Sequence, residues 1–214
     1  MNPIPKTNPN QPDRATVQAR YDAIAKWYDG AARFTMAHRS AAVHALGIQD
    51  GARILDLACG TGINFENLIT VNANGWLLGL DYSLGSLEQA QERVKRNRWD
   101  KVVLGLGDAA QLPFANNTFD RVLCTYALKA IPLYQQALDE VQRVLKPQGV
   151  FVVMDAALSD GMTRFLNPLI RWMARGFFYA IDRPLINEIA RRFQDVQTTE
   201  YDFGYTVVVV ARKE

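Results

Sequence analysis

Three acidic side chains follow three short apolar runs, and this spacing is the first sign of chemistry in the sequence. Asp56 lies in the run RILDLA, Asp81 ends the run WLLGLD, and Asp108 follows the run VVLGLG. The first run continues into a turn that holds Gly60 and Gly62, where the backbone can approach a ligand closely because glycine has no Cβ. In an open α/β sheet, such strand ends and turns meet at one edge, which is where the ligand binds.

The residues around this turn indicate a ligand without phosphate. A dinucleotide site needs G-x-G-x-x-G, but Phe65 stands where its third glycine would be, and the P-loop sequence is absent. Asp56 would repel phosphate and suits an ammonium group, whereas Asp81 can accept hydrogen bonds from both hydroxyls of a ribose. Asp108 can accept a hydrogen bond from an adenine amino group. Ammonium, ribose and adenine together describe S-adenosylmethionine, so we expect that cofactor.

The elements that must position these residues alternate along the chain. Apolar runs typical of strands alternate with helix-like segments, which predicts a mostly parallel α/β sheet covered on both faces. Two strand-like runs at the C-terminus are joined so closely that they predict an antiparallel hairpin, giving seven strands in all. The expected strands are 53–58, 76–81, 102–107, 119–125, 149–155, 196–202 and 204–212, and the expected helices are 15–27, 34–46, 63–70, 83–97 and 133–144.

Four stretches resemble the class I S-adenosylmethionine-dependent methyltransferases in content, order and spacing. These are ILDLACGTG (54–62), GLDYS (79–83), GDAAQLPFANNTFDRV (107–122) and EVQRVLKPQG (140–149). The resemblance is strong over residues 21–155, and it implies a Rossmann-like α/β fold and an enzyme that transfers a methyl group from S-adenosylmethionine. The sequence departs from the family at Ala58 and Gln148, where glycine is frequent.

The expected cofactor-binding residues lie in these stretches, after the fourth strand and in the N-terminal helix. They are Tyr28, Asp56, Ala58, Gly60, Thr61, Gly62, Asn64, Asp81, Tyr82, Ser83, Asp108, Ala109, Ala110, Thr125 and Tyr126. Single signals have ordinary alternatives, since the glycines could form a simple turn and Asp81 could cap the helix that begins at Ser83. No metal site is expected, because the chain has only two histidines and two cysteines.

The N-terminal helix carries Tyr21 and Tyr28, which are seven residues apart and therefore share a face. This stretch resembles the entry segment of the ubiquinone/menaquinone methyltransferases and of the bacterial soluble phosphatidylethanolamine N-methyltransferases. By that resemblance, the helix covers the cofactor as a lid, Tyr28 reaches the methionine part and Tyr21 lies over the reacting centre as the catalytic residue. The alternative is that both tyrosines are packing residues with solvated hydroxyl groups.

The segment 161–184 is rich in aromatic residues and arginines, and it indicates the substrate side. Within 162–193, six arginines face only two acidic residues, a net charge of +4. A helix with arginines on one side and Trp, Phe and Leu on the other can lie in an anionic membrane interface. The alternative is an ordinary amphipathic helix packed on the sheet. The expected substrate-binding residues are Arg171, Trp172, Arg175 and Tyr179.

These features predict methyl transfer to a lipid or another hydrophobic small molecule. The amine of phosphatidylethanolamine is the first expectation, and carbon methylation of a quinone precursor, or of another hydrophobic small molecule, is the alternative. Two other classes are a cofactor-binding module without catalysis and a nicotinamide-dependent oxidoreductase. The presence of both Asp56 and Asp81 argues against the first, and the missing third glycine argues against the second.

Composition sets the broader expectations. The net charge of +2 and the lack of basic runs argue against a nucleic-acid partner. With no apolar run long enough for a membrane span, we expect a cytoplasmic monomer or weak oligomer with a peripheral contact to the inner membrane surface. We expect a flexible leader over 1–14 and one domain over 15–214, which divides into lid helices (15–50), a cofactor-binding core (51–155), a variable segment facing substrate or membrane (156–195) and the hairpin (196–214).

Overall fold

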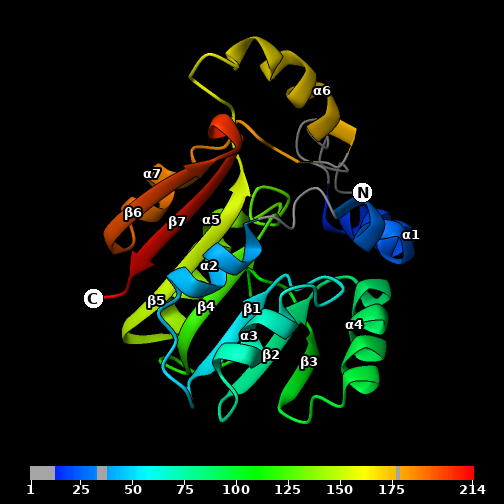
Figure 1. Ribbon diagram of the computed structural model, residues 1–214, viewed down its shortest axis with the longest axis vertical. Helices are drawn as coiled ribbons and strands as arrows, with labels where there is room; N and C mark the ends of the chain where they lie inside the picture. Colours follow the sequence, from blue (N-terminus) through cyan, green and yellow to red (C-terminus); the bar gives the residue numbers. More distant parts are fainter. Residues whose placement is uncertain (1–12, 33–37, 177–178) are drawn as a thin grey trace, which may run out of the picture.

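A seven-stranded sheet forms the centre of the molecule (Figure 1). The structure, a computed structural model, describes residues 13–32, 38–176 and 179–214, and in the first helix it describes side chains as far as Ala25. The strands are β1 (Arg53–Leu57), β2 (Trp76–Asp81), β3 (Val102–Leu106), β4 (Phe119–Thr125), β5 (Leu145–Ala156), β6 (Gln194–Tyr201) and β7 (Thr206–Arg212). Their order is β3-β2-β1-β4-β5-β7-β6.

The helices occupy both faces of this sheet and its carboxyl edge. They are α1 (Arg14–Ala32), α2 (Arg39–Ala45), α3 (Phe65–Val71), α4 (Leu84–Asn97), α5 (Tyr134–Val144), α6 (Asn167–Gly176) and α7 (Leu185–Ala190), with 3-10 turns η2 (Arg164–Leu166) and η3 (Asp202–Gly204). Apolar residues of α2, α3 and α4 pack on one face, and those of α5 and α7 pack on the other (Figure 1). The expected Rossmann-like fold is confirmed.

Strand directions also follow the expectation. Strands β1 to β5 are parallel, and β7 is antiparallel to both of its neighbours, β5 and β6. The C-terminal hairpin turns through η3, where Asp202, Phe203 and Gly204 all have positive φ angles. Several boundaries differ from the sequence prediction, and α1 extends to Ala32 rather than ending at Trp27. Strand β5 begins at Leu145, which pairs with Phe119 before a bulge, and α2 begins at Arg39 within the described residues.

Both positions where the family often has glycine adopt the left-handed conformation here. Ala58 has a φ of 54° and Gln148 has a φ of 62°. This region favours glycine, and each other residue type costs about 1–2 kcal/mol there. Both turns therefore keep the backbone conformation that glycine favours, although neither residue is glycine. The rest of the fold must offset this unfavourable conformational energy.

Phe65 explains why the third glycine of a dinucleotide motif is absent. Its side chain is fully buried, and a Cβ built on Gly79 of β2 would lie 2.7 Å from the Cζ atom of its ring. A Cβ built on Gly62 would lie 2.5 Å from another carbon of the same ring. The ring thus fills the space that two glycines leave open between the first turn and the sheet.

Replacing Gly79 with alanine should therefore destabilise the fold. The new methyl group would meet both Phe65 and the Sγ atom of Cys59, 3.0 Å away, so we expect the free energy of unfolding to fall by about 1–3 kcal/mol. The control is Gly105→Ala in β3, where nothing lies within 4 Å of the new Cβ. Urea unfolding of both variants measures the difference, and equal stability would contradict this account of Phe65.

Candidate functional site

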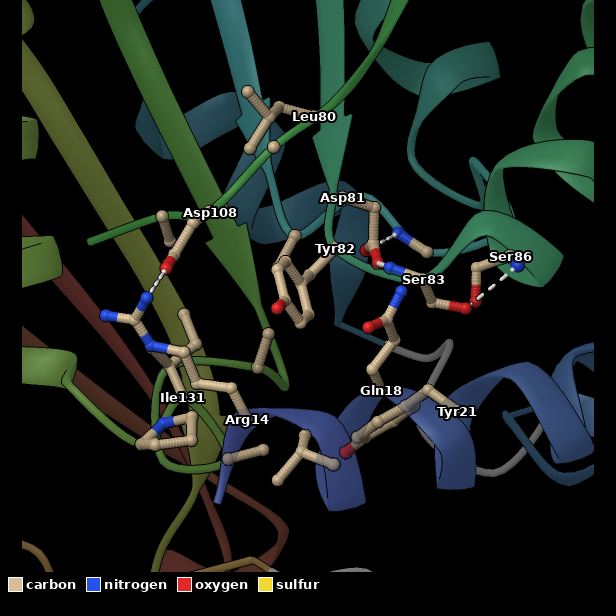
Figure 2. A pocket seen from close by; sticks show the side chains of 18 of the residues that line it. Arg14, Gln18, Tyr21, Leu80, Asp81, Tyr82, Ser83, Ser86, Asp108 and Ile131 are labelled. Atoms are coloured by element: carbon tan, nitrogen blue, oxygen red, sulfur yellow. Dashed lines mark hydrogen bonds and ion pairs between the residues drawn. The ribbon is translucent and has the colours of Figure 1, made fainter. Parts of the chain in front are cut away.

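A cavity opens at the carboxyl edge of the sheet, beyond the ends of β1, β2, β3 and β4 (Figure 2). It encloses about 900 Å³ when the space at its open mouth is included. Ten of the residues predicted from the sequence to be in the site line it: Tyr21, Ala58, Gly60, Asp81, Tyr82, Ser83, Asp108, Ala109, Thr125 and Tyr126. The topology therefore brings together the ends of four separate strands, as an open α/β sheet requires.

Asp81 joins the glycine turn to the start of α4. Its Oδ2 atom accepts a hydrogen bond from the backbone N–H of Gly60 at 2.7 Å, and its Oδ1 atom accepts one from the N–H of Ser83 at 2.8 Å. Burial raises the pKa of this carboxyl group, while the two N–H donors favour its ionised form. Ser83 itself caps α4, because its Oγ atom accepts from the N–H of Ser86 at 3.0 Å. Ser83, and not Asp81, is therefore the N-cap of α4.

Asp56 lies beneath the glycine turn rather than in the cavity lining. Its carboxyl group is fully buried, and the amide of Asn64 donates to both of its oxygens at 3.1 Å. Burial raises the pKa of Asp56 to about 7, opposed by Asn64 and by the charge of Arg39. The carboxylate expected to meet an ammonium group is therefore part of a polar cluster inside the fold.

Arg39 completes this cluster, and its role was not predicted from the sequence. Its Nη1 atom donates to the Oδ1 atom of Asn64 at 2.9 Å and to the Oγ1 atom of Thr125 at 2.6 Å. Only 4% of Arg39 is exposed. A signal was present, because Arg39 shares the helical spacing of the buried residues Ala42, Val43 and Leu46. An arginine on the apolar stripe of a short helix indicates a buried charge partner.

Asp108 is paired with an arginine from α1. Its Oδ2 atom lies 2.5 Å from the Nη1 atom of Arg14, and its Oδ1 atom accepts from the N–H of Ala110 at 2.9 Å (Figure 2). The prediction that residue 14 belongs to a flexible leader is therefore wrong, because Arg14 is the first residue of α1 and lines the cavity. The spacing of Arg14, Val17, Gln18 and Tyr21 on one helical face was the available signal.

Helix α1 forms one wall of the cavity and is tied to α4. Asp22 accepts hydrogen bonds through its Oδ1 atom from the Oγ atom of Ser83 at 2.5 Å and from the N–H of Gly85 at 3.0 Å. Figure 2 shows Gln18 and Tyr21 on the side of α1 that faces the cavity. The side chain of Tyr28 lies outside the described residues, so its expected contact with the cofactor stays a prediction.

Several other predicted residues do not line the cavity. On the cofactor side these are Asp56, Thr61, Gly62, Asn64 and Ala110, and on the substrate side they are Arg171, Trp172, Arg175 and Tyr179. Arg171 pairs with Asp182 at 2.9 Å, and the hydroxyl oxygen of Tyr179 accepts from the N–H of Ala156 at 3.2 Å. The opposite wall of the cavity is instead apolar, formed by Ala127, Ala130, Ile131, Pro132 and Leu133 after β4.

The described part of the chain sets two limits on the site. Among its residues, no group of three or more His, Cys, Asp or Glu side chains could hold a metal ion. None of its helices combines the length and apolar character needed to span a bilayer.

A comparison with known families identifies the chain. A family model described as a methyltransferase domain matches residues 48–191, which is more than half of the sequence and includes strands β1 to β5. The chain is a methyltransferase. It belongs to the family whose members use S-adenosylmethionine, and that is its cofactor. The cavity fits this ligand, because it combines a carboxylate at Asp81, a second at Asp108 and the close backbone approach at Gly60.

Individual relatives agree with this assignment. A demethylmenaquinone methyltransferase of Lactiplantibacillus plantarum is 35% identical over 204 residues, which cover 88% of this methyltransferase and 82% of that protein. An S-adenosylmethionine-dependent methyltransferase from Aquifex aeolicus shares the fold with a TM-score of 0.66 at 16% identity, covering 90% of this chain and 98% of that one. Phosphoethanolamine N-methyltransferase 2 of Haemonchus contortus was solved with phosphomonomethylethanolamine and S-adenosylhomocysteine. It shares the fold with a TM-score of 0.69 at 18% identity, covering 83% of this chain and 52% of that one.

A buried carboxyl group and a buried lysine, Asp155 and Lys129, lie next to the apolar wall of the cavity. Asp155, at the end of β5, is fully buried, and its Oδ1 atom accepts from the N–H of Ala156 at 2.9 Å. Burial raises the pKa of Asp155 to about 7, against the opposing charge of Lys129. The Nζ atom of Lys129 donates to the carbonyl oxygens of Ala156 at 2.8 Å and Ile181 at 2.9 Å. These hydrogen bonds anchor the start of the segment that follows β5.

The raised pKa of Asp155 predicts how stability depends on pH. The folded protein keeps a proton that the unfolded chain loses above its ordinary pKa of 3.8, so this contribution is present at low pH and is lost as pH rises toward 7. In the Asp155→Asn variant, the free energy of unfolding should decrease less steeply with pH than in the native protein, by up to about 1.4 kcal/mol per pH unit. Urea unfolding across this range measures it, with the exposed Asp160→Asn as control. Parallel curves for Asp155→Asn and the native protein would contradict the prediction.

Proposed function

We propose that this methyltransferase methylates a ring carbon of a reduced quinone-type acceptor. The observation that carries the proposal is the division of the cavity into a polar wall and an apolar wall. The polar wall has the carboxylates of Asp81 and Asp108, and the apolar wall runs from Ala127 to Leu133. An acceptor with a flat, apolar ring suits the second wall, and the Lactiplantibacillus plantarum relative, named a demethylmenaquinone methyltransferase, supports this choice.

The roles of the polar residues follow from their positions. Asp81 has lone pairs left for the ribose hydroxyls after it accepts from the N–H groups of Gly60 and Ser83. Asp108 would accept from the adenine amino group once Arg14 moves or shares its oxygen. Asp56 and Arg39 act indirectly by holding Asn64 beneath the turn. The bound cofactor supplies an activated methyl group on sulfur.

The acceptor reacts through its ring carbon. Held in line with that carbon, the bound cofactor would supply the methyl group, and the ring carbon would give up a proton to solvent in exchange. The chain contributes orientation and exclusion of water. Tyr21 on α1 lines the cavity, so we assign it the role of hydrogen-bonding a ring oxygen of the acceptor.

Phospholipid N-methylation, the first expectation from the sequence, has less support. The relative with 35% identity carries a name that refers to a quinone substrate. The Haemonchus contortus protein acts on a phosphoethanolamine compound, but its 18% identity supports only a shared fold. Carbon methylation, the alternative from the sequence, is therefore the better proposal.

A direct comparison of acceptors tests the proposal. The purified protein is supplied with S-adenosylmethionine and either reduced demethylmenaquinone in detergent or phosphatidylethanolamine vesicles, and the products are analysed by mass spectrometry. We expect one methyl group to be added to the quinone ring and none to the phospholipid headgroup. The Asp81→Asn variant controls for carry-over of another methyltransferase. Methylated ethanolamine headgroups without ring methylation would reverse the choice.

A further inference from the structure

The turn after β5 and helix α6 stand away from the sheet (Figure 1), and several of their large apolar side chains are exposed. Met162 is 96% exposed, Phe165 is 73% exposed and Trp172 is 70% exposed. Leu169 and Met173, between and beside them, are 53% and 50% exposed. We call these five residues the α6 apolar face. Proteins that function alone in water rarely expose such a continuous group of large apolar residues.

The orientation of α6 is the reverse of an ordinary surface helix. A packed amphipathic helix turns its apolar stripe toward the core and its polar residues toward water. In α6, Asn167 donates through Nδ2 to the carbonyl oxygen of Ser159 at 2.8 Å, and Arg171 pairs with Asp182. The polar side is thus fastened to the protein while the apolar side faces out, which indicates a surface that meets an apolar partner.

The arginines of this region divide into two groups. Arg171 and Arg192 pair with Asp182 and Asp139 respectively, and Arg183 donates to the carbonyl oxygen of Ile131. Arg164 and Arg175, which flank the α6 apolar face, are exposed and have no acidic partner among the residues that the structure describes. These two positive charges are available to an anionic partner.

We propose that the α6 apolar face and its two flanking arginines dock on the surface of an anionic lipid bilayer. Apolar side chains enter the boundary between headgroups and acyl chains, and arginines beside them bind the anionic headgroups. Helix α6 follows β5 at the carboxyl edge of the sheet, the same edge that carries the cavity. Docking would therefore hold the cavity near the bilayer. This proposal rests on the proposed function, because a cavity near the bilayer is useful only for a lipophilic acceptor.

A second copy of the chain fits this surface less well. Symmetric pairing of two α6 apolar faces would bring Arg164 and Arg175 of one copy near the same arginines of the other. Neither arginine forms an ion pair with an acidic side chain of the described residues that would offset this repulsion. A bilayer with anionic headgroups satisfies both the apolar and the charged parts.

Vesicle flotation of the full chain tests this docking. We expect binding to vesicles of phosphatidylcholine with phosphatidylglycerol, weaker binding at high salt, and little binding to phosphatidylcholine alone. Phe165→Glu should weaken binding at least about tenfold, whereas Trp76→Glu should leave it within about twofold. Trp76 is a matched control because it is 55% exposed but begins β2, at the opposite edge of the sheet.

The charge contribution has its own pair of variants. Arg164→Gln should weaken binding to the mixed vesicles about fivefold, and Arg96→Gln, on the exposed side of α4, should have no such effect. Folding of each variant is checked by its affinity for S-adenosylhomocysteine, which should not change. Equal vesicle binding by all variants, no binding to the mixed vesicles, or a dimer that Phe165→Glu dissociates would each overturn the proposal.

This result is separable from the choice of acceptor. If the protein binds the mixed vesicles through Phe165 and Arg164 but methylates no quinone, docking stands and the proposed function fails. If it methylates the quinone in detergent but all variants bind vesicles equally, the proposed function stands and docking fails.

Discussion

Asp81→Asn should weaken the binding of S-adenosylhomocysteine about 100-fold, or about 2.7 kcal/mol. Hydrogen bonds to a charged group contribute about 1.5–3 kcal/mol each, and this carboxylate is expected to accept from the ribose. It also accepts from two backbone N–H groups, of Gly60 and Ser83. An asparagine amide has only one acceptor oxygen, so its NH₂ group must face one of these donors. The variant therefore loses both the ligand contact and the brace of the turn.

Isothermal titration calorimetry measures this loss. Asp50→Asn is the control, because Asp50 also accepts a backbone hydrogen bond, from the N–H of Asn74 at 2.8 Å, but is exposed and does not line the cavity. We expect its affinity to match that of the native protein. An unchanged affinity for Asp81→Asn would place the ribose elsewhere in the cavity.

Arg39→Met should lower the free energy of unfolding by about 3–5 kcal/mol, the usual cost of removing one partner from a buried ionic cluster. Methionine preserves much of the length of the side chain, but it removes the donor to the Oδ1 atom of Asn64 and one of the two donors to the Oγ1 atom of Thr125. It also removes the positive charge that favours the ionised form of Asp56. The destabilisation should therefore be largest above pH 7, where Asp56 would otherwise carry its charge, and smaller below it.

The double variant Arg39→Met/Asp56→Asn distinguishes a charge effect from lost packing. Because asparagine carries no charge, we expect the second substitution to recover part of the stability above pH 7. Arg53→Met is the matched control, since Arg53 is an exposed arginine at the start of β1. Denaturant unfolding at several pH values measures the free energy of unfolding of the native protein, the single variant, the double variant and the control. A loss below about 1 kcal/mol for Arg39→Met would show that the cluster contributes little to stability.

The sheet could be predicted from the sequence because its strands are short apolar runs bounded by clear turns. Burial on both faces makes runs such as 149–155 continuously apolar, and this signal depends little on distant residues. The glycine turn could also be placed, since its position after the first strand is local information. Asp81 and Asp108, expected from the sequence to bind the cofactor, line the cavity, and that binding role stays a prediction.

Residues whose roles depend on distant partners could not be placed in this way. Asp56 is adjacent to the turn in sequence, yet folding encloses it with Asn64 and Arg39 in a buried cluster. Arg14 was assigned to the leader because a proline-rich stretch precedes it, and its pairing with Asp108 depends on tertiary structure. The outward direction of the α6 apolar face was equally hidden, since helical periodicity identifies a stripe but not which side meets the core.

The attachment of α1 to the rim of the cavity has a kinetic consequence. Arg14 and Asp22, about two helical turns apart, hold the helix to Asp108 and to the start of α4. We expect exchange of the spent cofactor to wait for this helix to detach, a motion of the microsecond to millisecond class. The residence time of the spent cofactor then depends on the contacts of Arg14 and Asp22 as much as on contacts with the cofactor itself. Turnover would be limited by departure of the product rather than by bond making.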